Sequence, residues 1–312
     1  LGIVVRLGNA RGGESLASDD GILDHHLGRR AAEATGKEAS NQEPTEAEAA
    51  DQSTEATTIT HQTENRAVHG KRSPYCPKGA STYSSTQSDG ERFYVNAFAD
   101  YVTDVATFVA SAKAQEPGLP VFLLGHSAGG VVSCLYTLDH QAEITGLICE
   151  SFAHELPAPD FALAVLKGLS HVAPHAHVVK LNNEDFSRDP EVLAAMNSDP
   201  LIAHEVQPTR TIAELARADE RLKREFGQIT LPVLILHGSA DKAAKASGSQ
   251  HFYDMAGSQD KTLKLYDGYF HDLLNDVGKE NVMADIQAWI DEHIPAATAV
   301  SSPGSEPVLA QR

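Results

Sequence analysis

Apolar residues recur at helical spacing in two long stretches of the chain. In residues 98–112 the third and fourth neighbours are repeatedly apolar, which is typical of an amphipathic helix. The segment "EPG" at 116–118 then supplies residues that end a helix. The stretch "ENVMADIQAWIDEHI", residues 280–294, shows the same periodicity. Both stretches therefore predict helices with one buried face. Their apolar positions are Phe98, Tyr101, Val102, Val105, Phe108, Val109 and Ala112 in the first, and Val282, Ile286, Trp289 and Ile290 in the second.

Short apolar runs separate the predicted helices. The segments "PVFLLGH", "ITGLICES" and "TLPVLILHGSADK" are nearly continuous in apolar residues, as expected of strands that are buried on both faces. The segment "KTLKLYDG" alternates and predicts a fourth strand, whereas "VVSCLYTL" suits a buried helix. Strands that alternate with helices indicate an α/β fold, in which a mostly parallel sheet has helices on both faces.

The lengths of the connections divide the chain into segments. Residues 152–228 separate the second and third predicted strands, and this is too long for a crossover loop. We therefore expect an inserted cap of helices there, with residues 88–151 and 229–296 forming the α/β core. The tail at 297–312 is expected to be disordered.

Residues 1–87 differ in composition from the rest. Ile59 is the only large aliphatic or aromatic residue between positions 31 and 66. Such a segment cannot bury enough apolar area to offset the entropy of ordering, so 9–87 is expected to be largely low-complexity or disordered. The strand at 121–124 would then be an unpaired sheet edge. One hypothesis is that 1–87 is not the native partner of 88–296, as an upstream reading-frame error would produce; the first residue, Leu1, is also consistent with a partial gene.

Charge and cysteine content narrow the classes of partner. The formal net charge of −18 over 312 residues argues against nucleic acid as a partner. No apolar run is long enough to span a membrane. Cys76, Cys134 and Cys149 show no CxxC spacing, so neither a disulfide framework nor a metal site is predicted, and a reducing, cytoplasmic location is favoured. The run "SHVAPHAHVV" is predicted to lie on the cap rather than to bind a metal.

A nucleophile motif lies at the end of the first core strand. Gly125, His126, Ser127, Ala128 and Gly129 form G-x-S-x-G between a predicted strand and a predicted helix, which is the context that the motif requires. The tight turn would expose the serine hydroxyl and place the next N–H at a helix N-terminus. We therefore predict that Ser127 is a nucleophile rather than part of a plain glycine-rich turn.

A base and an acid follow in the required order. Asp241 comes after the third strand and His271 after the fourth, and loops at the carboxyl ends of parallel strands meet at one sheet edge. We therefore predict a catalytic triad of Ser127, Asp241 and His271. Asp267 and Asp272 are competing acids, but each lies so near His271 in sequence that it would have to fold back.

These segments together resemble one enzyme family. "VFLLGHSAGG", "LPVLILHGSADK", "AGSQDKTLKLYDGYFHDLLND" and "DIQAWIDEHI" are similar to the monoacylglycerol lipase and lysophospholipase branch of the α/β-hydrolases, over about residues 88–296. The resemblance implies serine esterase chemistry on monoacylglycerols, lysophospholipids or similar single-chain esters. It places Ser127, Asp241 and His271 at the triad positions, and it implies that the helical cap shapes an acyl-chain pocket.

The chain departs from the family pattern in two places. Many members carry Met where this chain has Ala128, whose backbone N–H is the expected oxyanion donor. The family's second donor comes from a His-Gly loop in the first half of the chain. "AVHGKRSPY" offers His69 and Gly70, but too few residues follow it for the expected helix and strand, so an exposed loop is favoured over an oxyanion role. Glu150 and Ser151, at the end of a strand, are candidates for lining the substrate pocket.

The sequence therefore predicts a serine carboxylic-ester hydrolase that works through an acyl-enzyme, without a metal or an organic cofactor. Its partner is expected to be a small lipid ester, with no stable membrane insertion but transient contact through the cap. Alternatives are a related acyltransferase or amidase, or a non-catalytic or defective α/β-hydrolase-fold protein that lacks a complete oxyanion hole. The sequence motifs specify neither the acyl-chain length and head group of the substrate nor the oligomeric state of the protein.

Overall fold

The computed structural model describes residues 2–7, 58–62, 91–155, 158–199 and 206–295. Six strands of this described part form one sheet in the order β2-β1-β3-β4-β7-β8. Neighbours among β3, β4, β7 and β8 pair in parallel, as the sequence predicts. The strands are β1 (Gly2–Leu7), β2 (Thr58–Gln62), β3 (Val121–His126), β4 (Gly146–Glu150), β7 (Val233–Gly238) and β8 (Lys261–Tyr266).

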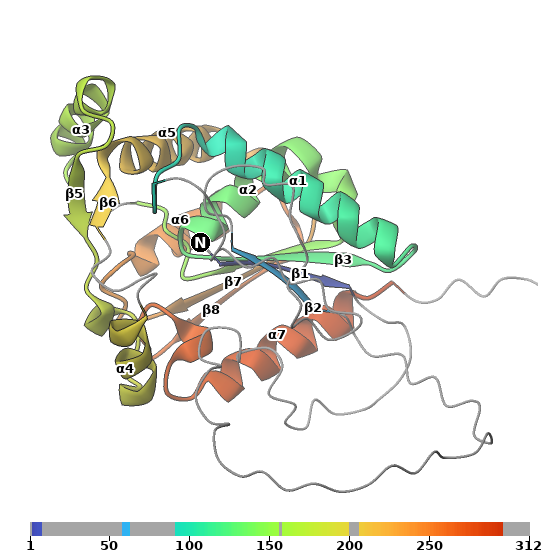
Figure 1. Ribbon diagram of the computed structural model, residues 1–312. Helices are drawn as coiled ribbons and strands as arrows, with labels where there is room; N and C mark the ends of the chain where they lie inside the picture. The colour runs from blue at the N-terminus through green and yellow to red at the C-terminus, as the bar shows by residue number, and fades with distance from the viewer. Residues whose placement is uncertain (1, 8–57, 63–90, 156–157, 200–205, 296–312) are drawn as a thin grey trace, which may run out of the picture.

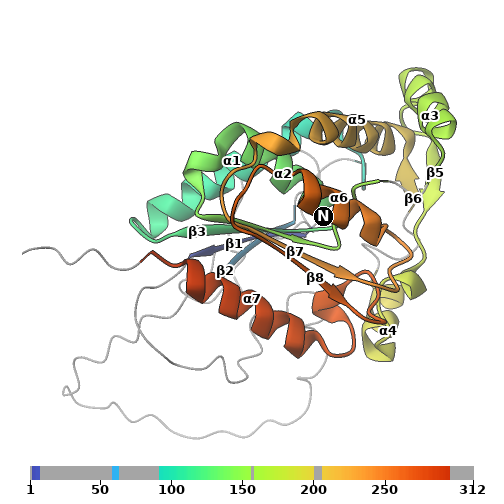
Figure 2. The same ribbon diagram turned by 180° about the vertical axis from the view of Figure 1, so that it is seen from behind.

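Helices cover both faces of the sheet. Helices α1, α2 and α5 lie on one face and α7 lies on the other, as Figures 1 and 2 show from opposite sides. Between β7 and β8 the chain forms α6. The bounds are α1 (Phe98–Gln115), α2 (Ala128–His140), α5 (Thr209–Glu225), α6 (Ala246–Met255) and α7 (Lys279–His293), with short 3₁₀ turns η2 (Gln141–Glu143), η4 (Phe226–Gln228) and η5 (Leu273–Asn275).

Strand β3 shows why its sequence is continuously apolar. Val121 and Leu123 belong to the core under α1, α2 and α5, whereas Phe122 and Leu124 belong to the core under α7. Successive side chains of a strand point to opposite faces, so a strand covered on both sides needs apolar residues at every position. Trp289 of α7 packs edge-on against Phe122, with ring centroids 5.9 Å apart.

The expected edge at β3 is not present, because β1 pairs with β3 in antiparallel register. Val4 lies opposite Leu124 and Gly2 opposite His126, so the strand that leads to the serine has a neighbour on each side. The expectation of an unpaired edge was wrong because a strand can pair with a segment far from it in the sequence, and here β3 pairs with the first residues of the described chain. The segment Gly2–Leu7 is rich in β-branched residues, which suit a strand.

The N-terminal low-complexity region also contributes one strand. Thr58–Gln62 forms β2, which pairs antiparallel with β1, so the expectation that 9–87 lacks packed structure is wrong for these five residues. The remaining residues of 8–90 lie outside the described part, as does the tail at 297–312. The predicted boundaries at residues 87 and 297 are therefore not assigned by the structure.

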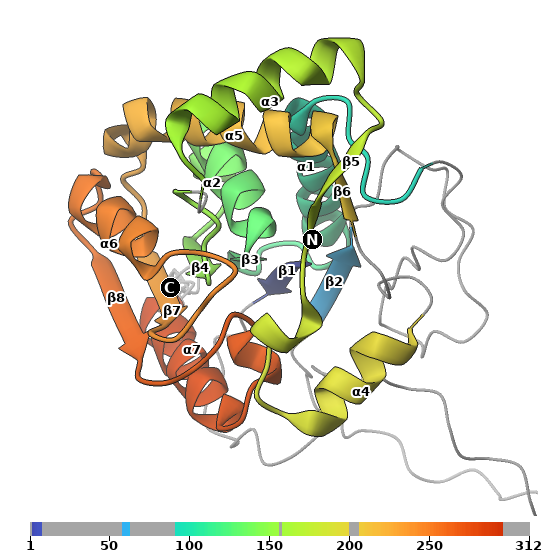
Figure 3. The same cartoon turned by 90° about the vertical axis from the view of Figure 1, so that its left-hand side faces the viewer.

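The segment between β4 and β7 contains helices and a second, smaller sheet. Its elements are α3 (Asp160–Val172), β5 (His177–Lys180), η3 (Asn183–Asp185), α4 (Pro190–Ser198), β6 (Val206–Pro208) and α5. Strands β5 and β6 pair antiparallel, a feature that the expectation of a purely helical insertion did not include. Helix α3 lies outermost, over α5, and α4 lies apart from it (Figure 3).

Candidate active site

The turn at Ser127 has a backbone conformation that few residues adopt. Ser127 has φ 54° and ψ −122° and lies between the end of β3 and the first residue of α2. A positive φ at a non-glycine residue costs of order 1–3 kcal/mol and persists only where the surrounding structure enforces it. Here the Ser127 carbonyl oxygen accepts hydrogen bonds from the N–H groups of Gly130, at 3.0 Å, and Ala153, at 3.2 Å. The strained serine is therefore fixed from two sides.

The glycines around the serine are required by close backbone approach. A Cβ at Gly125 would lie 2.4 Å from the carbonyl oxygen of Gly129 and 2.5 Å from Ser133 Oγ. A Cβ at Gly130 would lie 3.0 Å from the ring of Phe152. Real Cβ atoms essentially never come within 3.0 Å of another heavy atom, so a side chain at Gly125 would force strand and helix apart.

Three side chains from distant parts of the chain meet at this turn. His271 Nε2 lies 2.8 Å from Ser127 Oγ, and His271 Nδ1 lies 2.7 Å from Asp241 Oδ2. Ser127 follows β3, Asp241 follows β7 and His271 follows β8. The structure thus brings together the three residues that the sequence analysis selected. Asp267, one of the competing acids, instead accepts a hydrogen bond from Ser239 Oγ at 3.1 Å.

The surroundings of Asp241 keep it ionised. Burial alone would raise the pKa of this carboxyl, but His237 and His271 and the backbone N–H of Ala244 lower the pKa below its ordinary value. Its Oδ1 accepts from the N–H groups of Ala243, at 2.8 Å, and Ala244, at 2.9 Å. Because an ionised carboxylate can only accept, His271 Nδ1 donates to it, and Nε2 is left as the acceptor for the serine hydroxyl.

Comparisons with known proteins agree on one family. The family described as "Serine aminopeptidase, S33" matches residues 85–278. Human monoglyceride lipase is 33% identical over 222 residues, which cover 70% of this chain and 73% of that protein. The monoacylglycerol lipase of Mycolicibacterium smegmatis is 31% identical over 211 residues, covering 67% of this chain and 75% of that protein.

The chain belongs to the monoacylglycerol lipase-like α/β-hydrolases.

Solved structures agree with this assignment. The monoacylglycerol lipase of Paleococcus ferrophilus aligns with a TM-score of 0.61 at 25% identity, over 69% of this chain and 84% of that one. A soluble variant of monoglyceride lipase from Saccharomyces cerevisiae, in complex with a substrate analog, aligns with a TM-score of 0.58 at 26% identity, over 70% and 79% of the two chains. As a member of this family, the protein is a carboxylic ester hydrolase.

Glu150 and Ser151 have a role different from the expected lining of a substrate pocket. Both are fully buried. Glu150 Oε1 accepts from the Leu273 N–H at 2.8 Å and from Ser151 Oγ at 3.2 Å, and its other oxygen pairs with His126 Nδ1. The expectation failed because the end of β4 faces inward at this point, toward the loop that carries His271. Glu150 therefore links β4 to that loop instead of facing substrate.

His126 is the cation that compensates Glu150. Burial alone would lower the pKa of His126, but the facing Glu150 carboxylate, with a smaller effect from Asp272, raises it to about 9. The imidazole is thus protonated at neutral pH. Its ring centroid lies 4.9 Å from that of His271. This side chain is therefore a structural partner of Glu150 beside the hydrolase site.

Contacts from the inserted segment also hold His271, and sequence reasoning missed them. The ring of Phe186 packs edge-on against His271, with centroids 4.9 Å apart, and the Phe186 carbonyl accepts from the Asp272 N–H at 2.8 Å. Arg188 Nε pairs with the buried Asp276 at 2.9 Å, and Asp276 Oδ2 accepts from the Phe270 N–H at 2.8 Å. The letters "FSRDP" carry no periodic signal that would have revealed these contacts.

The expected oxyanion donor, the N–H of Ala128, lies among the described residues. Ala128 is the first residue of α2, so its N–H lies at the positive end of the helix beside Ser127. Gly129, the second glycine of the motif, follows it and is buried. His69 and Gly70 lie outside the described residues. The interpretation of this segment as an exposed loop therefore stays a prediction.

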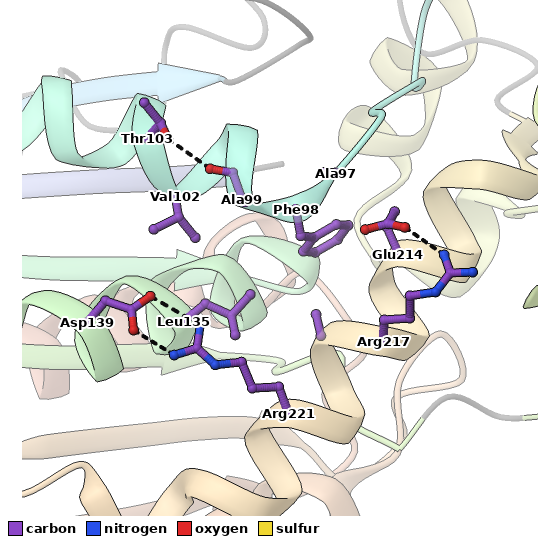
Figure 4. A pocket seen from close by; sticks show the side chains of 11 residues that line it. Ala97, Phe98, Ala99, Val102, Thr103, Leu135, Asp139, Glu214, Arg217 and Arg221 are labelled. Carbon is purple, nitrogen blue, oxygen red and sulfur yellow. Dashed lines mark hydrogen bonds and ion pairs between the residues drawn. The ribbon is translucent and has the colours of Figure 1, made fainter.

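A pocket away from Ser127 lies between three helices. It has a volume of about 390 Å³, and its walls include Phe98 of α1, Leu135 of α2 and Arg221 of α5 (Figure 4). Arg221 Nη2 is held 2.6 Å from Asp139 Oδ1 at its rim. No residue of the candidate site lines this pocket.

The histidines of the run "SHVAPHAHVV" each lie beside a charged side chain. His175 and His177 face Glu91, at 2.5 Å and 3.7 Å, whereas His171 lies 3.3 Å from Arg217. Cys134 and Cys149 are buried free thiols whose sulfur atoms lie 3.5 Å apart, and Cys76 lies outside the described residues. Among the described helices, none combines the length and apolar character needed to cross a membrane.

Proposed function

We propose that this hydrolase cleaves monoacylglycerols, lysophospholipids or similar single-acyl-chain esters through an acyl-enzyme on Ser127. The observation that supports it most directly is the chain of contacts from Asp241 through His271 to Ser127, at 2.7 and 2.8 Å. Relatives named monoglyceride lipase, together with "Phospholipase YtpA" of Bacillus subtilis at 26% identity, support the substrate class.

The proposed first half of the reaction forms the acyl-enzyme. His271 Nε2 accepts the proton of Ser127 as Oγ bonds to the ester carbonyl carbon. Asp241 holds the imidazole in the tautomer that leaves Nε2 free and stabilises the imidazolium that forms. The Ala128 N–H donates to the developing oxyanion. His271 then gives its proton to the leaving alcohol as the bond between the carbonyl carbon and the ester oxygen breaks.

The second half repeats these steps with water. His271 accepts a proton from a water molecule that attacks the acyl carbonyl carbon, and the same proton returns to Ser127 Oγ as the acyl group leaves as a carboxylic acid. The edge-on ring of Phe186 contacts His271, and Asp276, paired with Arg188, accepts from the neighbouring Phe270 N–H; these contacts hold His271 in place through both halves. The groups of the chain that these steps use are Ser127, His271, Asp241 and the Ala128 N–H.

A substrate panel tests this proposal. The purified chain is assayed with a monoacylglycerol, a lysophospholipid, a triacylglycerol and an aminoacyl arylamide, the last because the matching family is described as a serine aminopeptidase. We expect kcat/KM for a single-chain ester to exceed that for the triacylglycerol and the amide by at least about tenfold, a difference of about 1.4 kcal/mol. Preferential cleavage of the amide, or no ester cleavage, would contradict the proposal.

We further propose that the inserted segment, residues 152–228, acts as the cap and contacts lipid aggregates transiently through α3. Four apolar residues on this helix follow each other at intervals of four, four and three, which places them on one face. They are Phe161 (73% exposed), Val165 (68%), Leu169 (39%) and Val172 (84%). Helix α3 lies over α5 (Figure 3), and Lys167, on the side of α3 opposite this stripe, pairs with Glu220 of α5. Such a stripe is suited to a lipid surface, where a single-chain ester resides.

Substitutions that place charged residues on this stripe can distinguish binding to lipid aggregates from the chemical reaction. The double variant Val165→Glu/Val172→Glu should lower the rate on vesicle-borne monoacylglycerol by on the order of tenfold, because burial of exposed apolar side chains is lost. The rate on a water-soluble short-chain ester should stay unchanged. Leu265→Glu on β8, another exposed apolar position, is the control and should affect neither rate. Equal loss on both substrates would show that α3 does not serve as the lipid contact.

A further inference from the structure

A second cluster of chemistry-bearing side chains lies outside the triad. His154 and Glu155 follow β4 in the loop that leads into the inserted segment, and His251 lies on α6. The ligating atoms of these three residues all lie within 4.8 Å of one another. None of the three takes part in the proposed ester chemistry, and the sequence analysis predicted no metal site here.

Two of the three separations between these ligand atoms match those around a tetrahedral ion, and the third is within 4.8 Å. His154 Nε2 lies 3.2 Å from His251 Nδ1, and His251 Nδ1 lies 3.3 Å from Glu155 Oε1. Zinc binds imidazole nitrogen and carboxylate oxygen at about 2.0–2.2 Å in tetrahedral geometry, so two ligands of one ion lie roughly 3.3 Å apart. Two separations in the cluster match that value.

Neighbouring side chains orient the three ligands in the way that metal sites require. His154 Nδ1 pairs with the carboxylate of Asp219 on α5, which directs Nε2 toward His251. Asp219 Oδ1 also accepts from the Glu155 N–H at 3.3 Å, and Lys223 holds its other oxygen at 3.1 Å. Ser247 Oγ donates to Glu155 Oε2 at 3.0 Å, which leaves Oε1 facing His251.

Packing makes the cluster rigid on one side and open on the other. His154 is fully buried between the rings of Phe152 and Phe226, at centroid distances of 5.4 and 5.0 Å. A Cβ at Gly248 would lie 2.3 Å from the His154 carbonyl oxygen, so glycine is needed for α6 to approach this loop. The His251 side chain is 34% exposed and leaves room for a solvent ligand.

We propose that His154, His251 and Glu155 bind one Zn²⁺ ion, with Asp219 orienting His154 and water as the fourth ligand. Two nitrogens and one carboxylate, without sulfur, suit zinc better than magnesium or calcium, which prefer oxygen. The ion links the loop after β4 to α6 directly, and to α5 through Asp219. It therefore joins the inserted segment to the core.

The bound ion would also brace the nucleophile turn. The Ala153 N–H, adjacent to His154, donates to the Ser127 carbonyl oxygen at 3.2 Å. A fixed His154 limits the movement of this donor and thus of the strained serine backbone. The site is structural, because it lacks a contact with the reacting atoms.

Zinc titration of the full chain tests the proposal without reference to activity. Metal is removed by chelation, and Zn²⁺ is added in competition with a chromophoric chelator; Co²⁺ in place of Zn²⁺ reports geometry through the strong visible absorption of tetrahedral sites. We expect one tight site in the wild type and a higher Tm with Zn²⁺. His251→Gln and Glu155→Gln change partly exposed residues, so both should fold, and each should weaken binding by at least about 100-fold. Asp219→Asn should weaken it by about 10–100-fold.

A matched control separates this site from adventitious surface binding. His177→Gln removes a histidine that faces Glu91 elsewhere on the surface and should leave the affinity, the Co²⁺ spectrum and the rise in Tm unchanged. Loss of the tight site in His251→Gln but not in His177→Gln supports the proposal. A wild type without a tight site, or a His251→Gln variant with wild-type affinity and stoichiometry, overturns it.

Discussion

Replacing Ser127 with alanine is expected to lower kcat for ester hydrolysis by about 10⁶-fold, the size of effect that removal of a serine nucleophile produces. The variant keeps the fold, because alanine fits the same space and the strained φ of 54° is held by hydrogen bonds to the Ser127 carbonyl rather than to its side chain. Steady-state hydrolysis of a soluble ester measures the loss. A fluorophosphonate probe should label the wild type on the peptide that contains Ser127 and leave the variant unlabelled.

Ser239→Ala is the matched control for this variant. Ser239 lies in the loop after β7, and its Oγ accepts from the Gly268 N–H at 2.8 Å. It should retain both turnover and labelling. Ester turnover by Ser127→Ala within about tenfold of the wild-type rate would show that another residue is the nucleophile, since the loss of a nucleophile cannot be that small.

Asp241→Asn should lower kcat by about 10⁴-fold, as loss of the orienting carboxylate does in a serine triad. The two Oδ1 contacts to the N–H groups of Ala243 and Ala244 survive if the amide oxygen takes that position, so the loop can keep its shape. The amide N–H₂ then faces His271 and favours the tautomer with hydrogen on Nε2. That nitrogen can no longer accept the serine proton. The measurement is kcat on a soluble ester, with circular dichroism to verify the fold.

Asp267→Asn and Asp272→Asn are the comparison variants, because both acids lie near His271 in sequence. Each should keep kcat within a few-fold of wild type. The fall of kcat on the acid side of the pH–rate profile supplies a further check. Because the pKa of Asp241 lies below its ordinary value of 3.8, Asp241 is ionised at every pH above 3.8. Protonation of Asp241 therefore cannot cause a fall of kcat above that pH. A wild-type kcat in Asp241→Asn, or a comparable loss in Asp267→Asn, would reassign the acid.

The parallel part of the sheet and the meeting of Ser127, Asp241 and His271 could be predicted because they rest on local patterns. Strands β3, β4 and β7 are buried on both faces, so each reads as a short continuous apolar run, whose length favours a strand over a buried helix. The three residues follow strands that point the same way. Parallel strands bring such positions to one edge whatever the sequence distance between them.

Contacts that depend on tertiary packing alone could not be predicted. The pairing of β1 with β3 joins segments more than a hundred residues apart, and no pattern in either segment indicates its partner strand. The inward direction of Glu150 depends on where the loop with His271 folds back, so its position at a strand end suggested a pocket residue. Likewise, His154, Glu155 and His251 share no sequence motif, because ligands from a loop and a helix carry no fixed spacing.

The antiparallel pairing of β1 has a practical consequence for anyone who shortens this chain. Because the composition changes near residue 88, an experimenter could choose to express a fragment that begins there. Such a fragment keeps all three residues of the proposed triad. Such a fragment would lose Gly2–Leu7 and expose the backbone N–H and C=O groups of β3, whose side chains are apolar on both faces. Fragment design should therefore keep the first strand, for instance by joining it through a short linker, if the shortened enzyme is to stay dispersed at working concentrations.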